Sequence, residues 1–239
     1  FPPKSILSII SGAKDQLITP QDFEQEAGGD YRKQVVAKVY AAYQAKLFAA
    51  NAVDFDDIIR LTVELFQNFP DVLEHYQNRY KFIMVDEYQD TNQAQYRLVS
   101  MLADKHHNLC VVGDDDQSIY KFRGATIENI LNFEDQFPNC KTIRLEQNYR
   151  STQNILSAAN SVIKNNKERK AKKLWTASGD GEKVTVFKAT DEQAESKFVA
   201  DTILNDIKDG MKYFDHAILY RMNAQSNSIE RAFVQSGIP

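Results

Sequence analysis

Apolar residues in the first part of the chain recur at helical spacing. Between residues 30 and 50 they follow steps of three and four positions, which places them on one face of a long helix. Two further helical patterns begin at residues that cap helices well, namely Thr19, which is followed by a proline, and Asp54. The pattern therefore predicts helices up to residue 50 and another helix after Asp54.

From residue 82 onward, short apolar runs alternate with helical patterns. The three runs occupy residues 82–85, 109–112 and 142–145, and each stops at glycine or acidic residues. The stretches between them, 93–103 and 127–137, carry helical spacing. Short buried strands separated by helices indicate a parallel α/β sheet, which binds its ligands at the carboxyl ends of the strands.

The pattern restarts near residues 146–151 and predicts the beginning of a second α/β unit. Ser151 is the expected cap of a helix that reaches the neighbourhood of Asn165. The polar segment 165–173 predicts a solvated loop or a helix end.

The rest of this second unit repeats the alternation of strand and helix. Apolar runs at 184–187 and 217–220 predict two strands. Between them, Asp191 is the expected cap of a helix that continues to the region of Lys208.

Composition adds few constraints. The 239 residues are 43% hydrophobic and 26% charged with a formal net charge of −4, an ordinary globular mix without a global basic signature. The two cysteines, Cys110 and Cys140, exclude a disulfide framework and a cysteine–histidine zinc site, and Cys110 is expected in the core. No apolar stretch approaches the roughly 18 residues that a membrane helix needs.

The glycines carry a more specific signal. None of the nine is followed by lysine, so the chain contains no Gly-Lys-Ser or Gly-Lys-Thr phosphate loop. The chain starts with Phe1 rather than methionine and ends at Pro239. We expect both ends to be cuts in a longer polypeptide.

The first segment that carries chemistry is Val85-Asp86-Glu87-Tyr88-Gln89-Asp90-Thr91. An apolar strand that ends in Asp-Glu can present a metal-binding carboxylate beside a general base. Asp86 would then hold Mg²⁺, directly or through water, and Glu87 would polarise the water that attacks a phosphoanhydride. The alternative is a strand end with two solvated acids.

The second segment, residues 112–125, contains an acidic triplet, a glutamine and a group of aromatic and basic side chains. Gln117 has the chemistry to hydrogen-bond a γ-phosphate. Tyr120, Phe122 and Arg123 combine stacking faces with a cation, as single-stranded nucleic-acid binders do. The alternatives are a simple loop or hard-metal site for the triplet, and core packing for the aromatic residues.

The third segment, residues 145–152, contains Tyr149 and Arg150 at the start of the second predicted unit. This pair has the chemistry to stack on a base and to bind a phosphate. The alternative is a surface arginine beside a packing tyrosine.

Together these segments resemble one family, the UvrD/PcrA/Rep-like superfamily 1 DNA helicases, and most closely the PcrA group of Gram-positive bacteria. Residues 54–59 and 217–226 match motifs of the same family, so the resemblance covers essentially the whole chain. It implies a RecA-like P-loop NTPase fold with parallel sheets, only partly contained in this chain, and an N-terminal all-helical insert segment. A helicase-related nuclease subunit of the same superfamily stays open as an alternative, as does a non-catalytic module that binds DNA or a partner.

The resemblance also implies a role for each candidate residue around the nucleotide. Asp86 would coordinate Mg²⁺ and Glu87 would be the catalytic base. Gln117 would sense the γ-phosphate of ATP and couple it to the DNA contacts. Tyr149 would stack on adenine, and Arg150 would contact the γ-phosphate across the cleft between two RecA-like domains.

For DNA, the resemblance implies that Tyr120, Phe122 and Arg123 line the single-strand track. The family usually has tryptophan where this sequence has Phe122. Phenylalanine keeps a stacking face but offers less area and no N–H donor.

The same resemblance implies a domain division. Residues 1–53 would be the rear part of the helical insert subdomain, residues 54–145 the C-terminal part of the first RecA-like ATPase domain, and residues 146–239 the N-terminal part of the second. The family's phosphate loop would precede this chain, and its last motifs would follow it.

The expected function is therefore that of a fragment of an ATP-dependent helicase that translocates 3′ to 5′ on single-stranded DNA, with ATP and Mg²⁺ as cofactors. Its expected partners are single-stranded DNA, duplex junctions and repair or replication proteins, and its expected location is the cytoplasm. Without a phosphate loop, the chain alone is expected to hydrolyse ATP negligibly. A sheet that lacks a central strand exposes backbone edges, which leaves strand exchange or dimerisation open.

Overall fold

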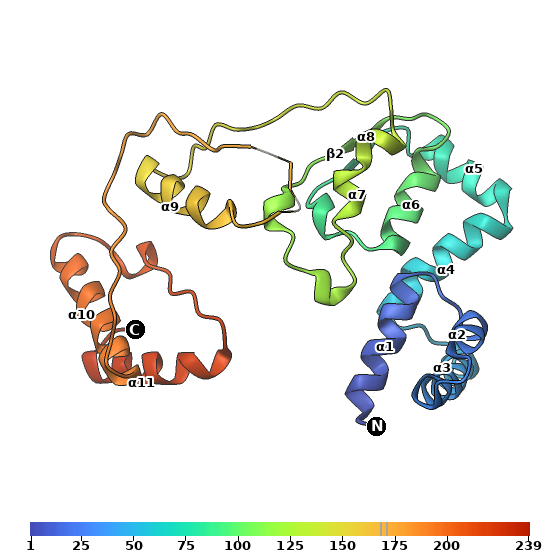
Figure 1. Cartoon of the computed structure of the whole chain (residues 1–239), viewed down its shortest axis with the longest axis horizontal. Coiled ribbons are helices and arrows are strands. Elements are labelled where there is room, and N and C mark those ends of the chain that lie inside the picture. Colours follow the sequence, from blue (N-terminus) through green and yellow to red (C-terminus); the bar gives the residue numbers. More distant parts are fainter. Residues whose placement is uncertain (168, 171) are drawn as a thin grey trace. The chain divides into compact units, whose positions relative to one another are not determined.

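The chain folds into two compact units, residues 1–179 and residues 180–239. The computed structural model describes residues 1–167, 169–170 and 172–239. The helices and strands of the larger unit, drawn in Figure 1, are α1 (Pro3–Asp15), α2 (Pro20–Ala27), α3 (Tyr31–Ala49), α4 (Phe55–Asn68), α5 (Pro70–Arg79), β1 (Ile83–Val85), α6 (Gln93–Ala103), β2 (Leu109–Val111), α7 (Glu128–Leu131), α8 (Phe133–Gln136) and α9 (Gln153–Ile163). The smaller unit contains α10 (Glu192–Lys208) and α11 (Ser226–Ser236). Across the described residues, none of the helices has the length and apolar content that spanning a membrane requires.

The first helices begin where capping residues stand in the sequence. Thr19 Oγ1 accepts a hydrogen bond from Asp22 N (3.2 Å) and the Asp22 carboxylate accepts one from Thr19 N (3.1 Å), which forms a capping box at the start of α2. The Asp54 carboxylate accepts a hydrogen bond from Asp57 N (2.8 Å) at the start of α4. The predicted helices of this region are therefore confirmed.

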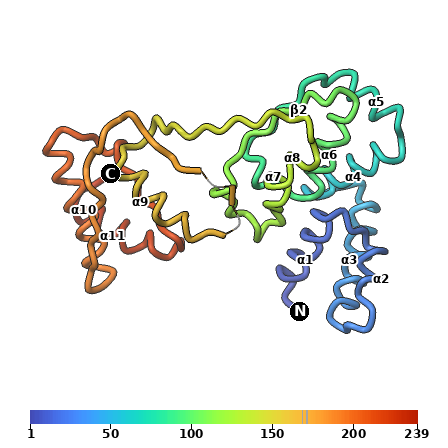
Figure 2. Tube along the Cα trace, turned by 45° about the horizontal axis from the view of Figure 1, so that its top comes forward, coloured from blue at the N-terminus to red at the C-terminus, as the bar shows by residue number. Residues whose placement is uncertain are grey.

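An apolar cluster joins α1 to α3. Its buried members are Ile10, Ala13, Val36 and Tyr40, and each is at most 4% exposed. The hydroxyl of Tyr40 donates to the carbonyl of Ile18 (3.1 Å), so the polar atom of this buried ring is paired. Figure 2 shows α1, α2 and α3 together at one end of the unit, with α4 leading away from them.

A second apolar cluster joins α4 to α6. Val63, Phe66 and Met101 are its buried members, and side chains of α5 pack against them. Helix α6 follows directly on the segment after β1 that carries Asp86 and Glu87. Its packing on α4 therefore fixes the end of that segment to the helical part of the unit.

A buried charge network also joins α1 to α4. The fully buried side chain of Lys14 pairs with Asp54 (2.6 Å) and with Asp57 (3.0 Å), which is fully buried as well. Arg60 Nε donates to Asp57 Oδ1 (3.1 Å). Burial by itself would raise the pKa of Asp57, but hydrogen bonds from Gln44 and Lys14 outweigh it and hold that pKa below its ordinary value.

Strands β1 and β2 form a two-stranded parallel sheet in which Met84 lies opposite Cys110. The pairing continues past the strand ends, because Val112 N donates to the Val85 carbonyl (2.8 Å) and Tyr88 N donates to the Val112 carbonyl (3.0 Å). These two predicted strands are confirmed. The expectation that Cys110 is a core residue is wrong: Cys110 is exposed and Met84 is 81% exposed.

The predicted strand at 142–145 is wrong. This segment pairs with no strand among the described residues, and Figure 1 draws it as an extended chain between α8 and α9. A strand needs a neighbouring edge to satisfy its backbone groups, and here the ladder is limited to one bridge between Gln147 and Trp175.

Two helix predictions in the same part of the chain need correction. The helical pattern at 127–137 forms two short helices, α7 and α8, which are separated at Asn132. Helix α9 has Thr152 as its N-cap rather than Ser151. Both differences concern helix ends and breaks, which depend on local contacts more than on apolar spacing.

The smaller unit consists of α10 packed on α11, with Ala200, Ile203 and Ile238 at the centre of its core. The predicted cap of α10 is confirmed, since the Asp191 carboxylate accepts a hydrogen bond from Ala194 N (2.8 Å). The predicted strands at 184–187 and 217–220 are wrong, because the described part of this unit offers them no neighbouring strand.

Candidate functional site

The end of β1 presents two carboxylates in an unusual backbone turn. Glu87 has left-handed backbone angles, with φ of 52° and ψ of 39°, and starts a 3₁₀ turn over Tyr88–Asp90. Its backbone N–H donates to Asp86 Oδ1 (2.9 Å). A residue other than glycine is strained by about 1 kcal/mol or more in this conformation, and such strain is concentrated at functional sites. Both carboxylates are exposed.

A cavity of about 330 Å³ lies beside these carboxylates. Its walls are formed by the end of β1, the 3₁₀ turn and α6, and the residues are Val85, Asp86, Glu87, Asp90, Thr91, Gln95, Leu98 and Val99. Asp90 Oδ1 is buried and has no hydrogen-bond partner in the described part of the chain. Such an oxygen is ordinarily satisfied by a ligand, water or ion, so Asp90 adds a candidate polar contact to the wall of this cavity.

Gln89 connects Glu87 to the loop that follows β2. Its side chain is buried, with 1% exposure. Gln89 Nε2 donates to Glu87 Oε2 (2.8 Å), and Gln89 Oε1 accepts a hydrogen bond from Asp114 N (2.9 Å). One amide therefore orients the Glu87 carboxylate and binds the backbone of the neighbouring loop.

The close approach at this point requires glycine at position 113. A Cβ atom there would lie 2.7 Å from Gln89 Oε1 and 2.7 Å from Ile130 Cδ1. Any side chain would push the loop away from Gln89, so Gly113 is what allows Asp114 to reach it.

Asp114 also organises the side chains of its own loop. It caps the 3₁₀ turn over Asp115–Gln117, accepts a hydrogen bond from Gln117 Nε2 (2.7 Å), and forms an ion pair with Lys172. Burial alone would raise the pKa of Asp114, but the hydrogen bonds from Lys172 and Gln117 outweigh it and lower the pKa below its ordinary value. Asp114 is therefore ionised around neutral pH, and Gln117 is held by it.

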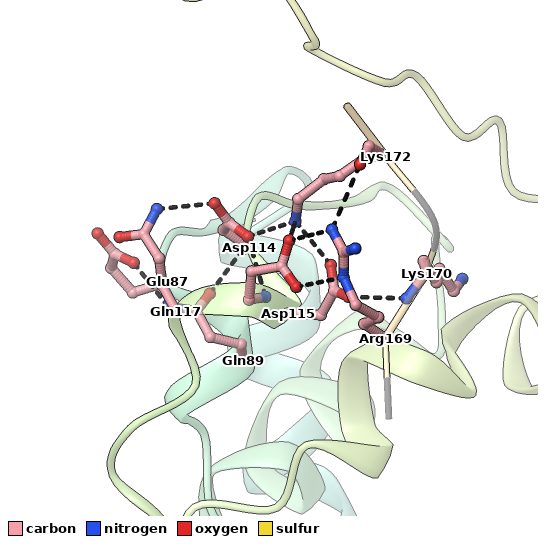
Figure 3. A network of polar contacts seen from close by, with 9 residues as sticks. Glu87, Gln89, Asp114, Asp115, Gln117, Arg169, Lys170 and Lys172 are labelled. Atoms are coloured by element: carbon pink, nitrogen blue, oxygen red, sulfur yellow. Dashed lines mark hydrogen bonds and ion pairs between the residues drawn. The ribbon is translucent and has the colours of Figure 1, made fainter. Parts of the chain in front are cut away.

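A basic segment after α9 neutralises the acidic triplet (Figure 3). Arg169 donates from Nε and from a terminal nitrogen to the two oxygens of Asp116 (2.7 Å each), and Lys172 pairs with Asp115 (2.9 Å). The expectation of a solvated loop over 165–173 is therefore wrong for Arg169, Lys170 and Lys172, while positions 168 and 171 lie outside the described residues. Because cations occupy the triplet, the alternative of a hard-metal site there is disfavoured.

Tyr120, Phe122 and Arg123 form an exposed group immediately after this loop. The two rings stack with their centroids 5.9 Å apart, and the Arg123 guanidinium lies 5.4 Å from the Tyr120 ring centroid. Phe122 is 77% exposed, so the alternative of core packing is wrong for this side chain. The group offers aromatic faces and a cation to solvent.

The turn that carries this group passes close to α1 at Asp15. Gly124 has a φ of 80°, and a Cβ atom there would lie 2.7 Å from Asp15 Oδ2. Asp15 Oδ1 accepts a hydrogen bond from Asn92 Nδ2 (2.6 Å). Burial, followed by the charge of Asp56, raises the pKa of Asp15 to about 6.

Tyr149 and Arg150 lie outside the network around Glu87 and Gln117. Tyr149 is 81% exposed, and its hydroxyl donates to Gln147 Oε1 (3.0 Å). The Arg150 side chain is exposed, while its backbone N–H donates to Asn148 Oδ1 (3.0 Å). The structure thus joins Asp86, Glu87 and Gln117 through Gln89 and Asp114, but it does not join Tyr149 and Arg150 to them.

The carboxylates at the end of β1 fit a hard cation only as partial ligands. Among the described residues there is no group of three histidine, cysteine or acidic side chains that could hold a metal ion. Mg²⁺ is usually bound by one or two carboxylates together with water and substrate phosphates. Exposed Asp86 and the unpaired oxygen of Asp90 suit that mode.

Sequence reasoning missed Gln89, Arg169 and Lys172. The signals that could have found them are weak: a glutamine between two acids, and a basic cluster whose charge complements the acidic triplet. Neither signal identifies a partner, because the partner lies elsewhere in the chain.

Two family models match the chain. Residues 1–138 match the UvrD/REP helicase N-terminal domain, and residues 143–239 match the UvrD-like helicase C-terminal domain. The chain is also 53% identical over its full 239 residues to the ATP-dependent DNA helicase PcrA of Staphylococcus epidermidis, and 54% identical to that of Staphylococcus aureus. It spans 33% of the length of each of these relatives.

Proposed function

The chain belongs to the UvrD/REP helicase family, and from this membership we propose that it is the middle part of an ATP-dependent helicase that moves 3′ to 5′ along single-stranded DNA. Relatives that carry the name ATP-dependent DNA helicase are about three times longer than this chain, since it spans 33% of their length. The activity is therefore proposed for the whole protein. The chain alone lacks a Gly-Lys phosphate loop and is proposed to be inactive as an ATPase.

The observation that carries the proposal is the geometry of Glu87. Its carboxylate is exposed at the end of a parallel strand, is oriented by Gln89 at 2.8 Å, and borders a cavity. In the proposed mechanism Glu87 accepts a proton from the water that attacks the γ-phosphate. Asp86 would hold Mg²⁺, which would supply positive charge beside the phosphates when bound.

Three further residues complete the proposed nucleotide site. Gln117 contacts the γ-phosphate, and its place next to Asp114 supports this role, because Asp114 is tied to Glu87 through Gln89. Tyr149 stacks on adenine and Arg150 contacts the γ-phosphate from the second RecA-like domain. The exposure of both side chains leaves them accessible to a ligand.

The proposed DNA contact is the group Tyr120, Phe122 and Arg123. Stacked aromatic faces beside a guanidinium bind single strands with little sequence preference. Proposed partners of the whole protein are single-stranded DNA, duplex junctions, and repair or replication proteins. The proposed location of the whole protein is the cytoplasm.

The proposed architecture keeps three parts: the rear of a helical insert at 1–53, the end of a first RecA-like domain at 54–145, and the beginning of a second at 146–239. The gap between the two family models, at residues 139–142, supports a boundary in this region. The parallel pairing of β1 and β2 supports a RecA-like sheet that this chain contains only in part.

The test is substitution of Glu87 in the full-length protein that contains this chain. Glu87→Gln removes the base but keeps the size of the side chain, so DNA-stimulated ATP hydrolysis should fall at least about 100-fold. Binding of a fluorescent ATP analogue, measured by anisotropy, should stay close to that of the unsubstituted protein.

The matched control is Glu128→Gln, which removes an exposed carboxylate from α7 and should leave hydrolysis unchanged. Unchanged turnover in Glu87→Gln would remove Glu87 as the base. A protein that binds single-stranded DNA through Arg123 but shows no turnover at all would instead be a non-catalytic module.

A further inference from the structure

Asp114 lies at the centre of a continuous polar path (Figure 3). On one side, its backbone N–H reaches Gln89, and Gln89 reaches Glu87. On the other side, its carboxylate pairs with Lys172 from the segment after α9. Two residues therefore separate the Glu87 carboxylate from a cation far along the chain.

This path exists only while cations neutralise the carboxylates around Asp114. Asp114, Asp115 and Asp116 stand in consecutive positions, and the side chains of Asp115 and Asp116 are only 9% and 10% exposed. Like charges this close and this sheltered repel one another strongly unless cations neutralise them. The turn over Asp115–Gln117 therefore depends on its basic partners.

Those partners are supplied by one short segment. Lys172 reaches all three aspartates, with distances of 2.9 Å to Asp115 and 3.3 Å to Asp116, and Arg169 binds Asp116 through two nitrogens. The side chains of Lys172 and Arg169 are 19% and 16% exposed, so solvent screens these ion pairs only in part. Burial alone would lower the pKa of Lys172, but the hydrogen bonds that it donates to Asp114 and Asp115 outweigh burial and raise that pKa.

We propose that Lys172 and Arg169 are positioning residues for ATP turnover, which hold the Gly113–Gln117 loop in the form that lets Gln89 orient Glu87. The inference rests on the proposed role of Glu87 as the base. When the basic segment is withdrawn or neutralised, the three carboxylates separate and Asp114 moves. Gln89 then loses the partner of its Oε1, and the Glu87 carboxylate loses its orientation.

Hydrolysis therefore depends on the ion pairs that hold the segment after α9 against the acidic triplet. Most of the proposed nucleotide contacts do not require this path, because Asp86, Tyr149 and Arg150 lie outside it, and only the γ-phosphate contact of Gln117 depends on Asp114. We call this path from Lys172 through Asp114 and Gln89 to Glu87 the relay. Its loss therefore lowers kcat and leaves the KM for ATP nearly unchanged, a separation that general loss of structure would not produce.

The experiment measures steady-state ATP hydrolysis by the full-length protein at saturating single-stranded DNA. Lys172→Gln should lower kcat by about 10- to 100-fold with the KM for ATP within about twofold, since small misplacements of a catalytic group have effects of this size. Lys172→Arg keeps the charge and should recover kcat to within about threefold of the unsubstituted protein. Lys173→Gln is the matched control, because Lys173 is the exposed neighbour, and it should change neither parameter.

A double substitution tests whether the effect passes through Asp114. Asp114→Asn keeps the backbone N–H that reaches Gln89 and removes the charge that Lys172 neutralises, and by itself it should also lower kcat. Because both substitutions break one path, the double variant should be no slower than the slower single variant. Full multiplication of the two effects would contradict the relay, as would a normal kcat in Lys172→Gln.

Folding is checked by circular dichroism of every variant. If Lys172→Gln fails to fold, Asp114→Asn alone decides: a lower kcat with unchanged KM supports the relay, and a normal kcat overturns it.

Glu87→Gln measured in parallel separates the proposed role of Glu87 as the base from the proposed relay. If Glu87→Gln keeps turnover, the proposed base is wrong, whereas loss of turnover in Glu87→Gln together with normal Lys172 and Asp114 variants overturns only the relay.

Discussion

Two isoleucines of the larger unit have opposite surroundings. Ile10 in α1 is 2% exposed and packs against α3, whereas Ile143 in the segment before α9 is 68% exposed. The apolar run at 142–145 predicted Ile143 to lie in a buried strand, whereas Ile10 lies in the part of the chain that was predicted to be helical. The difference teaches that apolar spacing predicted helices that do form a core in this chain, whereas the apolar run at 142–145 predicted a strand that does not form.

The physical reason is the location of the hydrogen-bond partners. A helix satisfies its backbone within about four residues and needs a neighbour only for its apolar face. A parallel strand needs another strand, usually a dozen or more residues away, before its apolar residues have a surface to cover. Helices α1–α4 find their neighbours inside the chain, while residues 142–145 find no neighbouring strand within the part of the chain that the structure describes.

The largest expected effect comes from the buried charge of the helical region. Lys14→Met keeps the apolar length of the side chain but leaves Asp54 and fully buried Asp57 without their shared cation. The free energy of unfolding should fall by about 3–5 kcal/mol. Urea unfolding followed by far-ultraviolet circular dichroism measures the loss.

Lys4→Met is the control for this substitution, because Lys4 is exposed on the same helix. It should change the free energy of unfolding by less than about 0.5 kcal/mol. Equal effects of the two substitutions would show that the buried network does not stabilise the helical region.

The same substitution at the two isoleucines tests the comparison directly. Ile10→Ala leaves a cavity in the core between α1 and α3 and should lower the free energy of unfolding by about 2–5 kcal/mol. Ile143→Ala removes only exposed surface and should change it by less than about 0.5 kcal/mol. Urea unfolding of both variants gives the two values, and a large loss in Ile143→Ala would mean that the segment is buried in solution.

The smallest expected effect concerns Asp15, where the helical region meets the turn that carries Arg123. The pKa of Asp15 is raised to about 6 in the fold, so the folded state binds this proton more tightly than the unfolded state does. Stability therefore rises as pH falls from about 6 toward about 4, and the charged form is the costly one at neutral pH. Asp15→Asn keeps an oxygen for Asn92 and should raise the Tm at neutral pH by about 2–4 °C.

Thermal unfolding at two pH values checks this sign. The advantage of Asp15→Asn should disappear near pH 4, where Asp15 itself is protonated in the fold. Asp71→Asn, at an exposed carboxylate, should show no advantage that grows between pH 4 and neutral pH. An advantage of Asp15→Asn that is independent of pH would point to packing rather than to charge.

The parts of the fold that the sequence predicted are those in which the interacting residues are close together in the chain. Thr19, Asp54 and Asp191 cap the helices that follow them, and each bond spans three residues. The two paired strands and the carboxylates at the end of β1 were predicted for the same reason, since an apolar run and the polar residues after it are neighbours in sequence. The motif residues Asp86, Glu87 and Gln117 also lie in one network, as their motifs suggested.

The rest depended on residues that are distant in the chain. Lys172 and Asp114 are 58 positions apart, and Arg169 and Asp116 are 53 apart. No spacing rule links such pairs, so the basic segment was predicted to be solvated. In the same way, nothing in residues 142–145 indicates whether a neighbouring strand edge is present.

By itself the sequence determined most of the longer helices, the two paired strands, the family and the residue types of the candidate site, because these follow from local periodicity, capping and short motifs. Only the tertiary structure decided that Gln89 links Glu87 to Asp114, that Lys172 and Arg169 neutralise the acidic triplet, and that Phe122 faces solvent. These features require the chain to bring distant groups within a few ångströms. Hydrogen bonds and sheltered ion pairs form only between groups a few ångströms apart. The separation of two residues in the sequence does not show whether they lie that close.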